Sequence, residues 1–441
     1  MKNRFFKYVS QNILAMIGLS LYILADTYFI SKAVGANGIT ALNMALPVYG
    51  VIFALGQMVG VGSAIRYSIV KEQYRNSNKD GSNECDKYFS GALFWGFVIG
   101  VIFAVLGLVF PDKIVEIMGG DETIVAIGVP YFRIFMSFSP FFIFNYTCNA
   151  FVRNDGNPSV SMAATLISSL FNIVFDYILM FPLGMGMPGA ALATALSPVV
   201  GVMICMIHFL SKKNTVKFKW FKTSLTRLFH CCQVGMSAFV GEMSGAVIVM
   251  VFNFIILRLT GNIGVAAYGV VANTALVAVA VFNGVALGSQ PLISESYGKH
   301  NIKDIKLIEK LGVATALGLA VIIVIMIWGF TDTIVGVFNS QGSDRLLSLA
   351  RVGLRIYFIG FLFAGINIFC SSALSAIASV KWAFVLSILK GFVVVNVCAA
   401  ILAPIFGMNG VWVAFPLSEF ILLIISGFAM KKSIGALESE R

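Results

Sequence analysis

The stretch GMPGAALATALS at residues 186–197 returns late in the chain as GMNGVWVAFPLS at residues 407–418, with six of the twelve positions identical. Small residues near the start of each half also recur: Gly35, Gly38, Gly62 and Ser63 correspond to Gly261, Gly264, Gly288 and Ser289. Self-similarity at a nearly fixed offset marks an internal duplication. We therefore predict an N-terminal lobe at 1–210 and a C-terminal lobe at 224–441, joined by a basic linker at 211–223.

The composition of the chain is that of a membrane protein. Of its 441 residues, 59% are hydrophobic and only 12% are charged, whereas soluble domains carry about 25% charged residues. Nearly every segment between polar breaks reaches the ~20 residues that a helix needs to cross the bilayer. We predict twelve spans, at about 10–34, 39–70, 88–110, 122–150, 158–181, 188–211, 224–259, 264–296, 304–329, 345–378, 382–404 and 409–430.

Each half of the repeat holds an even number of predicted helices, so both halves start on the same side of the membrane. Such a parallel repeat is related by an axis along the membrane normal. The predicted fold is therefore an all-α membrane protein with twelve transmembrane helices in two six-helix lobes related by pseudo-two-fold symmetry. This is an architecture of transporters rather than of common enzymes.

The basic residues predict the orientation. Alternate loops on one side hold 23 of the 31 Lys and Arg residues, including Lys79, Lys222 and Arg441, whereas the opposite loops hold four. The positive-inside rule then places both termini in the cytoplasm, in a multi-pass protein of the plasma membrane. Because topology accounts for the net charge of +11, we expect no nucleic-acid partner.

Polar residues inside the apolar spans predict the functional site. They are Asp26 in LADTYF, Asn172 and Asp176 in FNIVFDY, and Thr194 in GAALATALS. A carboxylate at such depth costs at least ~2.5–3.5 kcal/mol on insertion scales, so it is usually retained for a function. Asn172 and Asp176 share one helix face, as do Ala190 and Thr194, because residues four apart lie one above the other.

These residues predict a cation site. Asp26, Asp176 and Thr194 lie ~12, ~8 and ~9 Å from the outer ends of their helices, at 1.5 Å per residue, so one pocket can contain them. Their oxygens suit a hard monovalent cation, and two close carboxylates repel, which also favours the uptake of a proton. Both Na⁺ and H⁺ are therefore candidate coupling ions, with no organic cofactor. An alternative is a buried polar network that only joins the helices.

The second half of the repeat serves as an internal control. At the same offsets it has Phe252 for Asp26, Val393 for Asn172, Val397 for Asp176 and Phe415 for Thr194. A purely structural polar network would be expected in both halves. The asymmetry favours a function confined to the first lobe.

Twelve helices in two halves, an Asp late in the first helix, N-x-x-x-D in the fifth and G-A-A-L-A-T in the sixth resemble the multidrug and toxic compound extrusion (MATE) transporters. The resemblance covers nearly the whole chain. Within the family, the chain is similar to the small bacterial drug exporters. It implies that Na⁺ or H⁺ binds at Asp26, Asn172, Asp176, the Ala190 carbonyl and the Thr194 hydroxyl. It also implies export of lipophilic, mostly cationic small molecules by cation antiport, in a chain that we expect to be monomeric.

The sequence departs from this family in the first and tenth helices. Segment 10–34 lacks the proline of many members and has only Gly18, and the tenth helix has Asn367 but no carboxylate. The candidates for a substrate site in the second lobe are Glu242, Asn367 and Glu419. For Glu419 the alternative is a structural ion pair with Lys390 on the neighbouring helix.

Three other functions are alternatives to antiport. A lipid-linked sugar flippase of related architecture is the nearest, although such proteins commonly have additional helices. A membrane-embedded enzyme is disfavoured because the sequence has no His–Glu, His–Cys or activated-Ser constellation. An ion channel is disfavoured because the two-lobe repeat has no filter-like loop.

Overall fold

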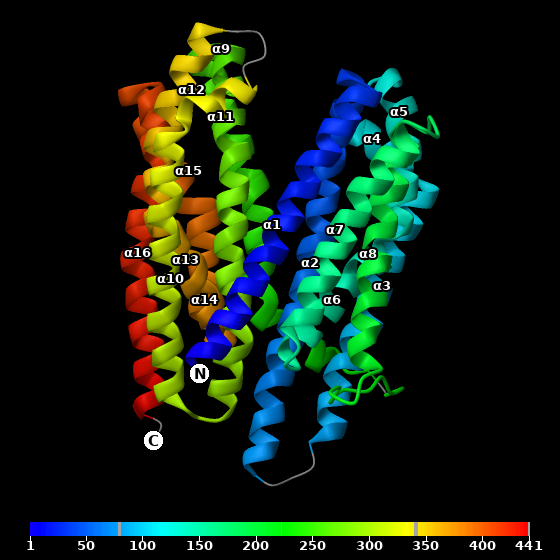
Figure 1. Ribbon diagram of the computed structural model, residues 1–441, viewed down its shortest axis with the longest axis vertical. Coiled ribbons are helices and arrows are strands. Elements are labelled where there is room, and N and C mark those ends of the chain that lie inside the picture. The colour runs from blue at the N-terminus through cyan, green and yellow to red at the C-terminus, as the bar shows by residue number, and fades with distance from the viewer. Residues whose placement is uncertain (78–80, 222, 339–342, 440–441) are drawn as a thin grey trace. The chain divides into compact units, whose positions relative to one another are not determined.

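The computed structural model describes residues 1–77, 81–221, 223–338 and 343–439 (Figure 1). Within these ranges every regular element is helical. The N-terminal elements are α1 (Lys2–Ala33), α2 (Ala36–Asn76), α3 (Ser82–Val109), α4 (Pro111–Ile117), α5 (Glu122–Ser137), α6 (Ser139–Asn154), α7 (Pro158–Met180) and α8 (Met187–Phe209). The others are α9 (Leu225–Gly298), α10 (Ile302–Gly329), α11 (Thr331–Phe338), α12 (Asp344–Tyr357), η1 (Phe358–Gly360), α13 (Phe361–Ala376), α14 (Val380–Ile388), η2 (Leu389–Val393), α15 (Val394–Phe406) and α16 (Met408–Ser439).

The predicted twelve spans are confirmed. In the described part of the chain, ten helical segments are long and apolar enough to cross a bilayer, and α5 with α6 forms an eleventh span bent by 45°. The remaining span comes from α9, whose 74 residues would extend about 110 Å at 1.5 Å per residue. Gly261 divides α9 into two spans, because its φ of 68° and ψ of −157° are not helical.

The backbone itself repeats. Gly35, which corresponds to Gly261, has nearly the same conformation, with φ 79° and ψ −155°. Glycine adopts a positive φ readily because it has no Cβ. The first and seventh spans of the repeat therefore end at the same kind of turn.

The structure corrects two of the residue matches between the halves. A Cβ on Gly189 would lie 3.1 Å from Leu179, and a Cβ on the corresponding Gly410 would lie 2.0 Å from Leu402. Leu179 therefore corresponds to Leu402, and the stretch from Leu402 to Gly410 is two residues shorter than the stretch from Leu179 to Gly189. The counterparts of Asn172 and Asp176 are then Val395 and Ala399, not Val393 and Val397. Both are buried and apolar, so the two halves still differ in the same way.

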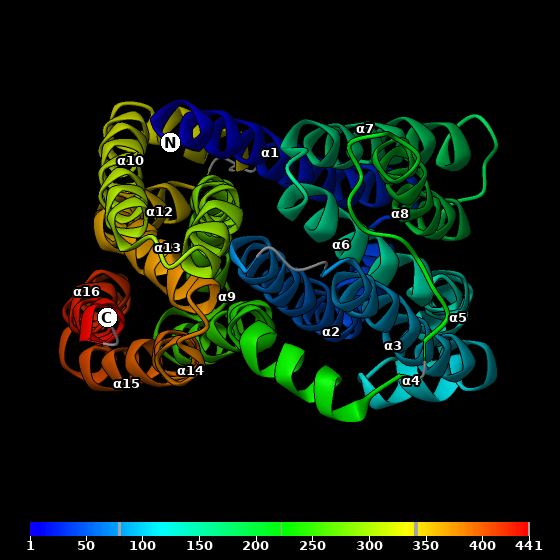
Figure 2. The ribbon, with the colours of Figure 1, turned by 90° about the horizontal axis from the view of Figure 1, so that it is seen from below.

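The chain packs as two compact units, Leu14–Glu242 and a second formed by Met1–Ile13 with Met243–Arg441. Helices α1 and α9 therefore each contribute residues to both units. Within the first unit α7 and α8 lie side by side (Figure 2), and Tyr49 stacks on Phe135 at 4.1 Å between ring centroids. In the second unit Tyr357 stacks on Phe415, also at 4.1 Å.

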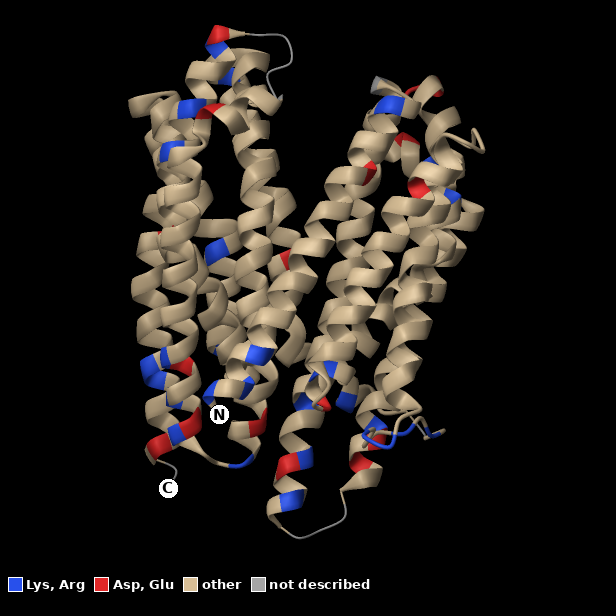
Figure 3. Cartoon of the chain, viewed as in Figure 1, with Lys and Arg blue, Asp and Glu red and all other residues tan. Residues whose placement is uncertain are grey.

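Charged residues gather near the ends of the helices in each unit, and few occupy the middle (Figure 3). This is the distribution expected of helices that cross a hydrocarbon layer. Among the basic residues that predict the orientation, Lys79, Lys222 and Arg441 lie outside the described residues.

Candidate functional site

The structure brings the predicted polar residues together in the Leu14–Glu242 unit. Asp26 lies on α1, Asn172 and Asp176 on α7, and Thr194 on α8. Their exposed fractions are 7%, 0%, 0% and 4%, and Ala190, one turn before Thr194, is fully buried. The carboxyl groups of Asp26 and Asp176 lie within hydrogen-bonding reach of each other. We refer to these five residues as the carboxylate site.

Helix α1 is one continuous helix from Lys2 to Ala33. Gly18 of α1, two turns before Asp26, faces Leu166 of α7: a Cβ at this position would lie 2.5 Å from Cδ2 of Leu166. That atom is the end of a flexible side chain, so a larger residue here would first displace the Leu166 side chain.

Asn172 connects the two ends of the carboxylate site. With its amide nitrogen toward Asp176, Asn172 donates to Oδ2 at 3.2 Å. Its amide oxygen then accepts from the backbone N–H and the hydroxyl of Thr194, both at 3.3 Å. The spacing N-x-x-x-D predicted that Asn172 and Asp176 share one helix face, whereas the bonds to Thr194 depend on how α7 packs on α8.

Two oxygens of the carboxylate site have no hydrogen-bond donor. Oδ1 of Asp26 and Oδ1 of Asp176 are both buried without a partner among the described residues. Buried polar atoms are nearly always satisfied, so an unsatisfied pair calls for an explanation such as a proton or an ion. Two carboxylates, an amide and a hydroxyl are oxygen donors of the kind that a hard monovalent cation or a proton requires.

The donor set does not suggest a transition-metal centre. In the described ranges, no group of three or more His, Cys, Asp and Glu side chains is placed to hold a metal ion. Two carboxylates with neutral oxygens fit an alkali cation better, since soft or borderline metals prefer sulfur and imidazole ligands.

Three tyrosines beside the carboxylate site were not predicted from the sequence. The hydroxyls of Tyr22, Tyr49 and Tyr131 lie close enough to Asp26 and Asp176 for an electrostatic interaction with both carboxylates. Tyr49 and Tyr131 also form a hydrogen bond of 3.2 Å with each other. Tyr22 could have been identified, because it lies one helical turn before Asp26. The other two come from α2 and α5 and have no signal in the local sequence.

Two of the second-lobe candidates, Asn367 and Glu419, contact each other. Nδ2 of Asn367 donates to Oε2 of Glu419 at 2.7 Å and to its carbonyl at 2.9 Å, and the hydroxyl of Ser426 donates to Oδ1 of Asn367. Glu242 belongs to the other unit, where Nε2 of Gln57 donates to its Oε1 at 2.6 Å. Asn367 and Glu419 thus form a hydrogen-bonded pair.

The expected ion pair of Glu419 with Lys390 is absent. The ion pairs of the described chain do not include these two residues, although the charge of Glu419 acts on Lys390 from a longer distance. The ion pair was expected because the two helices are antiparallel neighbours. This arrangement does not determine how either helix is rotated about its axis. Glu419 is instead held by Asn367.

A second buried carboxylate, Asp155, lies at the end of α6. It accepts hydrogen bonds from Tyr67 at 2.5 Å, Lys71 at 2.7 Å, His208 at 2.9 Å, and both the backbone N–H (2.9 Å) and the hydroxyl of Thr215. Burial alone would raise the pKa of Asp155, but the bonds from His208 and Lys71 outweigh it and hold this pKa below its usual range. Because Thr215 lies in the linker, Asp155 ties the linker to the first unit.

Residues 12–178 and 238–405 match the MatE family, one segment in each half of the repeat. The chain belongs to the MatE family. A relative is the multidrug export protein MepA of Staphylococcus aureus (strain bovine RF122 / ET3-1), 26% identical over 92% of this chain and 88% of the relative. MepA of Staphylococcus saprophyticus is 24% identical over 89% of this chain and 85% of the relative.

Solved structures confirm the twelve-helix, two-lobe fold. A structure described as the outward-facing conformation of a multidrug resistance MATE family transporter of the MOP superfamily has a TM-score of 0.92 and 21% identity, over 99% of this chain and 96% of that one. A crystal structure of MATE in complex with MaL6 has a TM-score of 0.93 and 22% identity, over 99% and 97%. At such identity the likeness concerns the fold alone.

Proposed function

We propose that this protein is an antiporter that exports lipophilic, mostly cationic drugs from the cytoplasm in exchange for Na⁺ or H⁺. The observation that supports this most directly is the carboxylate site, where each of two buried carboxylates has one oxygen without a donor among the described residues. The multidrug export proteins among the relatives make drugs the favoured substrate class.

The carboxylate site suggests how the ion acts. Without an ion or proton, Asp26 on α1 and Asp176 on α7 repel each other in a medium of low dielectric. A cation or a proton removes this repulsion and stabilises the arrangement in which the two carboxyl groups are close. An ion can shift a conformational equilibrium only by its difference in affinity for the two states, and this site provides such a difference. Drug and ion then compete through one equilibrium.

The function is tested in everted membrane vesicles that contain the full chain. Accumulation of a fluorescent lipophilic cation such as ethidium is followed with Na⁺ alone inside, or with an acidic interior and no Na⁺. We expect ethidium to accumulate in one of these two conditions. When both ion gradients are absent, we expect no accumulation. Accumulation that ignores both gradients would contradict antiport.

Replacing Asp26 by asparagine should reduce ion-driven transport more than replacing Glu419 by glutamine. Asp26 has an oxygen without a donor, whereas the side chain of Glu419 is held by Asn367. Asp26→Asn should therefore remove the dependence on the ion, with a loss of at least about tenfold, the effect of ~1.4 kcal/mol. Glu419→Gln should keep that dependence and lose only about threefold or less. The measurement is the initial rate of accumulation per folded transporter, and the reverse result would move coupling to the second lobe.

The proposed orientation has both termini in the cytoplasm. Lys213→Cys, at an exposed position of the linker, should react with an impermeant maleimide in everted vesicles but not in intact cells. The wild-type chain is the control, since its seven cysteines are buried or only partly exposed. Labelling from outside in intact cells would overturn the orientation.

A further inference from the structure

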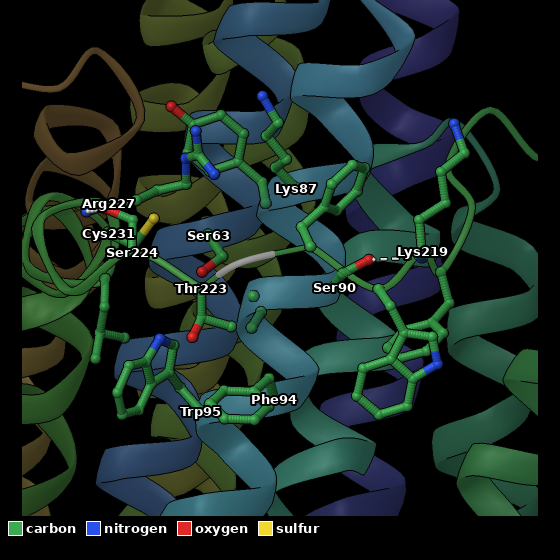
Figure 4. A pocket seen from close by; sticks show the side chains of 17 residues that line it. Ser63, Lys87, Ser90, Phe94, Trp95, Lys219, Thr223, Ser224, Arg227 and Cys231 are labelled. Carbon is green, nitrogen blue, oxygen red and sulfur yellow. Dashed lines mark hydrogen bonds between the residues drawn. The ribbon is translucent and has the colours of Figure 1, made fainter.

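A pocket separate from the carboxylate site lies in the Leu14–Glu242 unit (Figure 4). Its walls come from α2, the first half of α3, the linker 211–223 and the start of α9. The cavity volume of this pocket is about 40 Å³. No residue of the carboxylate site lines it.

The two ends of this pocket differ in chemistry. Figure 4 shows Lys87 and Arg227 at one end and Phe94 and Trp95 at the other. At the basic end, the Arg227 guanidinium lies over the ring of Tyr88, 5.5 Å from its centroid. A ligand that fits both ends has a charged or polar head and an apolar body.

The charges of the pocket favour an anionic head. Lys87 and Arg227 share one carboxylate, that of Glu84, at 2.5 Å and 3.2 Å. Lys219 pairs with Asp86 at 2.7 Å. Three cations thus face two carboxylates.

Arg66 adds a fourth cation beside the pocket. Arg66 does not line the pocket itself, but it follows Ser63, which does, by one turn of α2. Its Nε is buried without a hydrogen-bond partner, and in the described ranges no carboxylate forms an ion pair with it. The basic end therefore has a surplus of two positive charges.

The apolar end also has an unused donor. The indole N–H of Trp95 is buried and has no acceptor in the part of the chain that the structure describes. A buried donor without an acceptor costs about 1–3 kcal/mol. The ester or glycerol oxygens of a lipid are acceptors that lie between its charged head and its apolar chains.

The linker forms one wall of the pocket. The backbone N–H of Lys217 donates to Asp86 at 2.7 Å, and that of Lys219 donates to Ser90 at 2.9 Å, so the linker follows α3. Phe218 and Trp220 remain exposed, at 48% and 85%. Exposed aromatic residues that alternate with lysines are typical of the boundary between bilayer and water.

We propose that this pocket binds an anionic phospholipid of the cytoplasmic leaflet. The phosphate would bind to Lys87, Arg227 and Arg66. The indole N–H of Trp95 would donate to an ester or glycerol oxygen, and Phe94 would contact the start of an acyl chain. Basic pockets between membrane helices on the cytoplasmic side are sites of this kind. The leaflet follows from the proposed orientation, whereas the lipid class follows from the charges and the two unlike ends.

The test measures lipid binding to the purified full chain by native mass spectrometry. The titrant is phosphatidylglycerol, with phosphatidylcholine of the same acyl chains as the zwitterionic control, and inorganic phosphate and glycerol phosphate as free anions. We expect wild-type protein to bind phosphatidylglycerol at least tenfold more tightly than phosphatidylcholine. Neither free anion should displace it.

Two variants test the pocket itself. Arg66→Gln with Arg227→Gln leaves Glu84 paired with Lys87 and should weaken phosphatidylglycerol binding roughly 30-fold, from the usual contribution of each cation. Trp95→Phe keeps a ring but loses the N–H, and should weaken it about fivefold. Lys212→Gln with Lys213→Gln is the matched control, since it removes two charges from exposed linker residues outside the pocket, and should leave binding unchanged.

Each other outcome overturns the proposal. Equal binding of phosphatidylcholine excludes recognition of the charged head, and displacement by inorganic phosphate or glycerol phosphate makes the pocket a site for small anions. An equal loss in the Lys212/Lys213 control makes the effect one of general surface charge. If the arginine variant does not fold, unchanged binding by Trp95→Phe is sufficient to reject the site. None of these readouts depends on drug transport.

Discussion

Asp176→Asn is expected to abolish ion-driven drug transport, with a loss of at least about 100-fold, while the protein stays folded. Asp176 is fully buried, and its Oδ1 has no donor among the described residues. Asparagine has nearly the same shape but neither the charge nor the oxygen pair that binds a proton or a cation. A loss of about 100-fold corresponds to ~2.8 kcal/mol of coupling, within the range of a buried charge.

The measurement for Asp176→Asn is ethidium accumulation in everted vesicles under each ion gradient, normalised to folded protein. The midpoint of thermal unfolding should equal or exceed that of the wild type, because the variant removes one of two repelling carboxylates. Asp112→Asn, at an exposed position of α4, is the control and should transport normally. Wild-type rates in Asp176→Asn would rule out the carboxylate site as the coupling site.

Asp155→Asn is expected to destabilise the fold by about 3–5 kcal/mol, the usual result of removing one partner from a buried charge network. The carboxylate has no exposed area and accepts bonds from Lys71 and His208, so asparagine leaves their donors without the charge that holds them. Unlike Asp176→Asn, this variant should keep its ion dependence in whatever fraction remains folded. The measurement is the midpoint of unfolding of the purified protein.

The pH dependence of Asp155 has a definite sign. A carboxyl group whose pKa is lowered in the folded state contributes stability above the unfolded pKa of about 4, and this contribution is lost as the pH falls further toward the lowered value. The difference in stability between wild type and Asp155→Asn should therefore be constant near neutral pH and shrink below about pH 4. Lys71→Gln, which removes a partly exposed partner, should cost less. A larger loss in Lys71→Gln would contradict the central position of Asp155.

The repeat, the twelve spans and the pairs that share one helix face could be read from the sequence. Hydrophobic length and helical period are local properties, so Asn172 with Asp176 and Ala190 with Thr194 were predicted on common faces. The residue matches in the second half were wrong by two positions for Val393 and Val397, because a shorter turn changes the offset without leaving a mark in the helix pattern.

The sequence by itself determined which residues enter the membrane and which of them carry oxygen ligands at depth, because both depend on residue type and spacing along one helix. Only the tertiary structure decided that Asp26 meets Asp176, that Asn367 and not Lys390 holds Glu419, and that Asp155 joins Lys71, His208 and the linker. The physical reason is that the rotation and offset of one helix against another depend on side-chain packing over the whole interface. The hydrogen bonds between Asn172 on α7 and Thr194 on α8 are one such contact, because they depend on how these two helices pack.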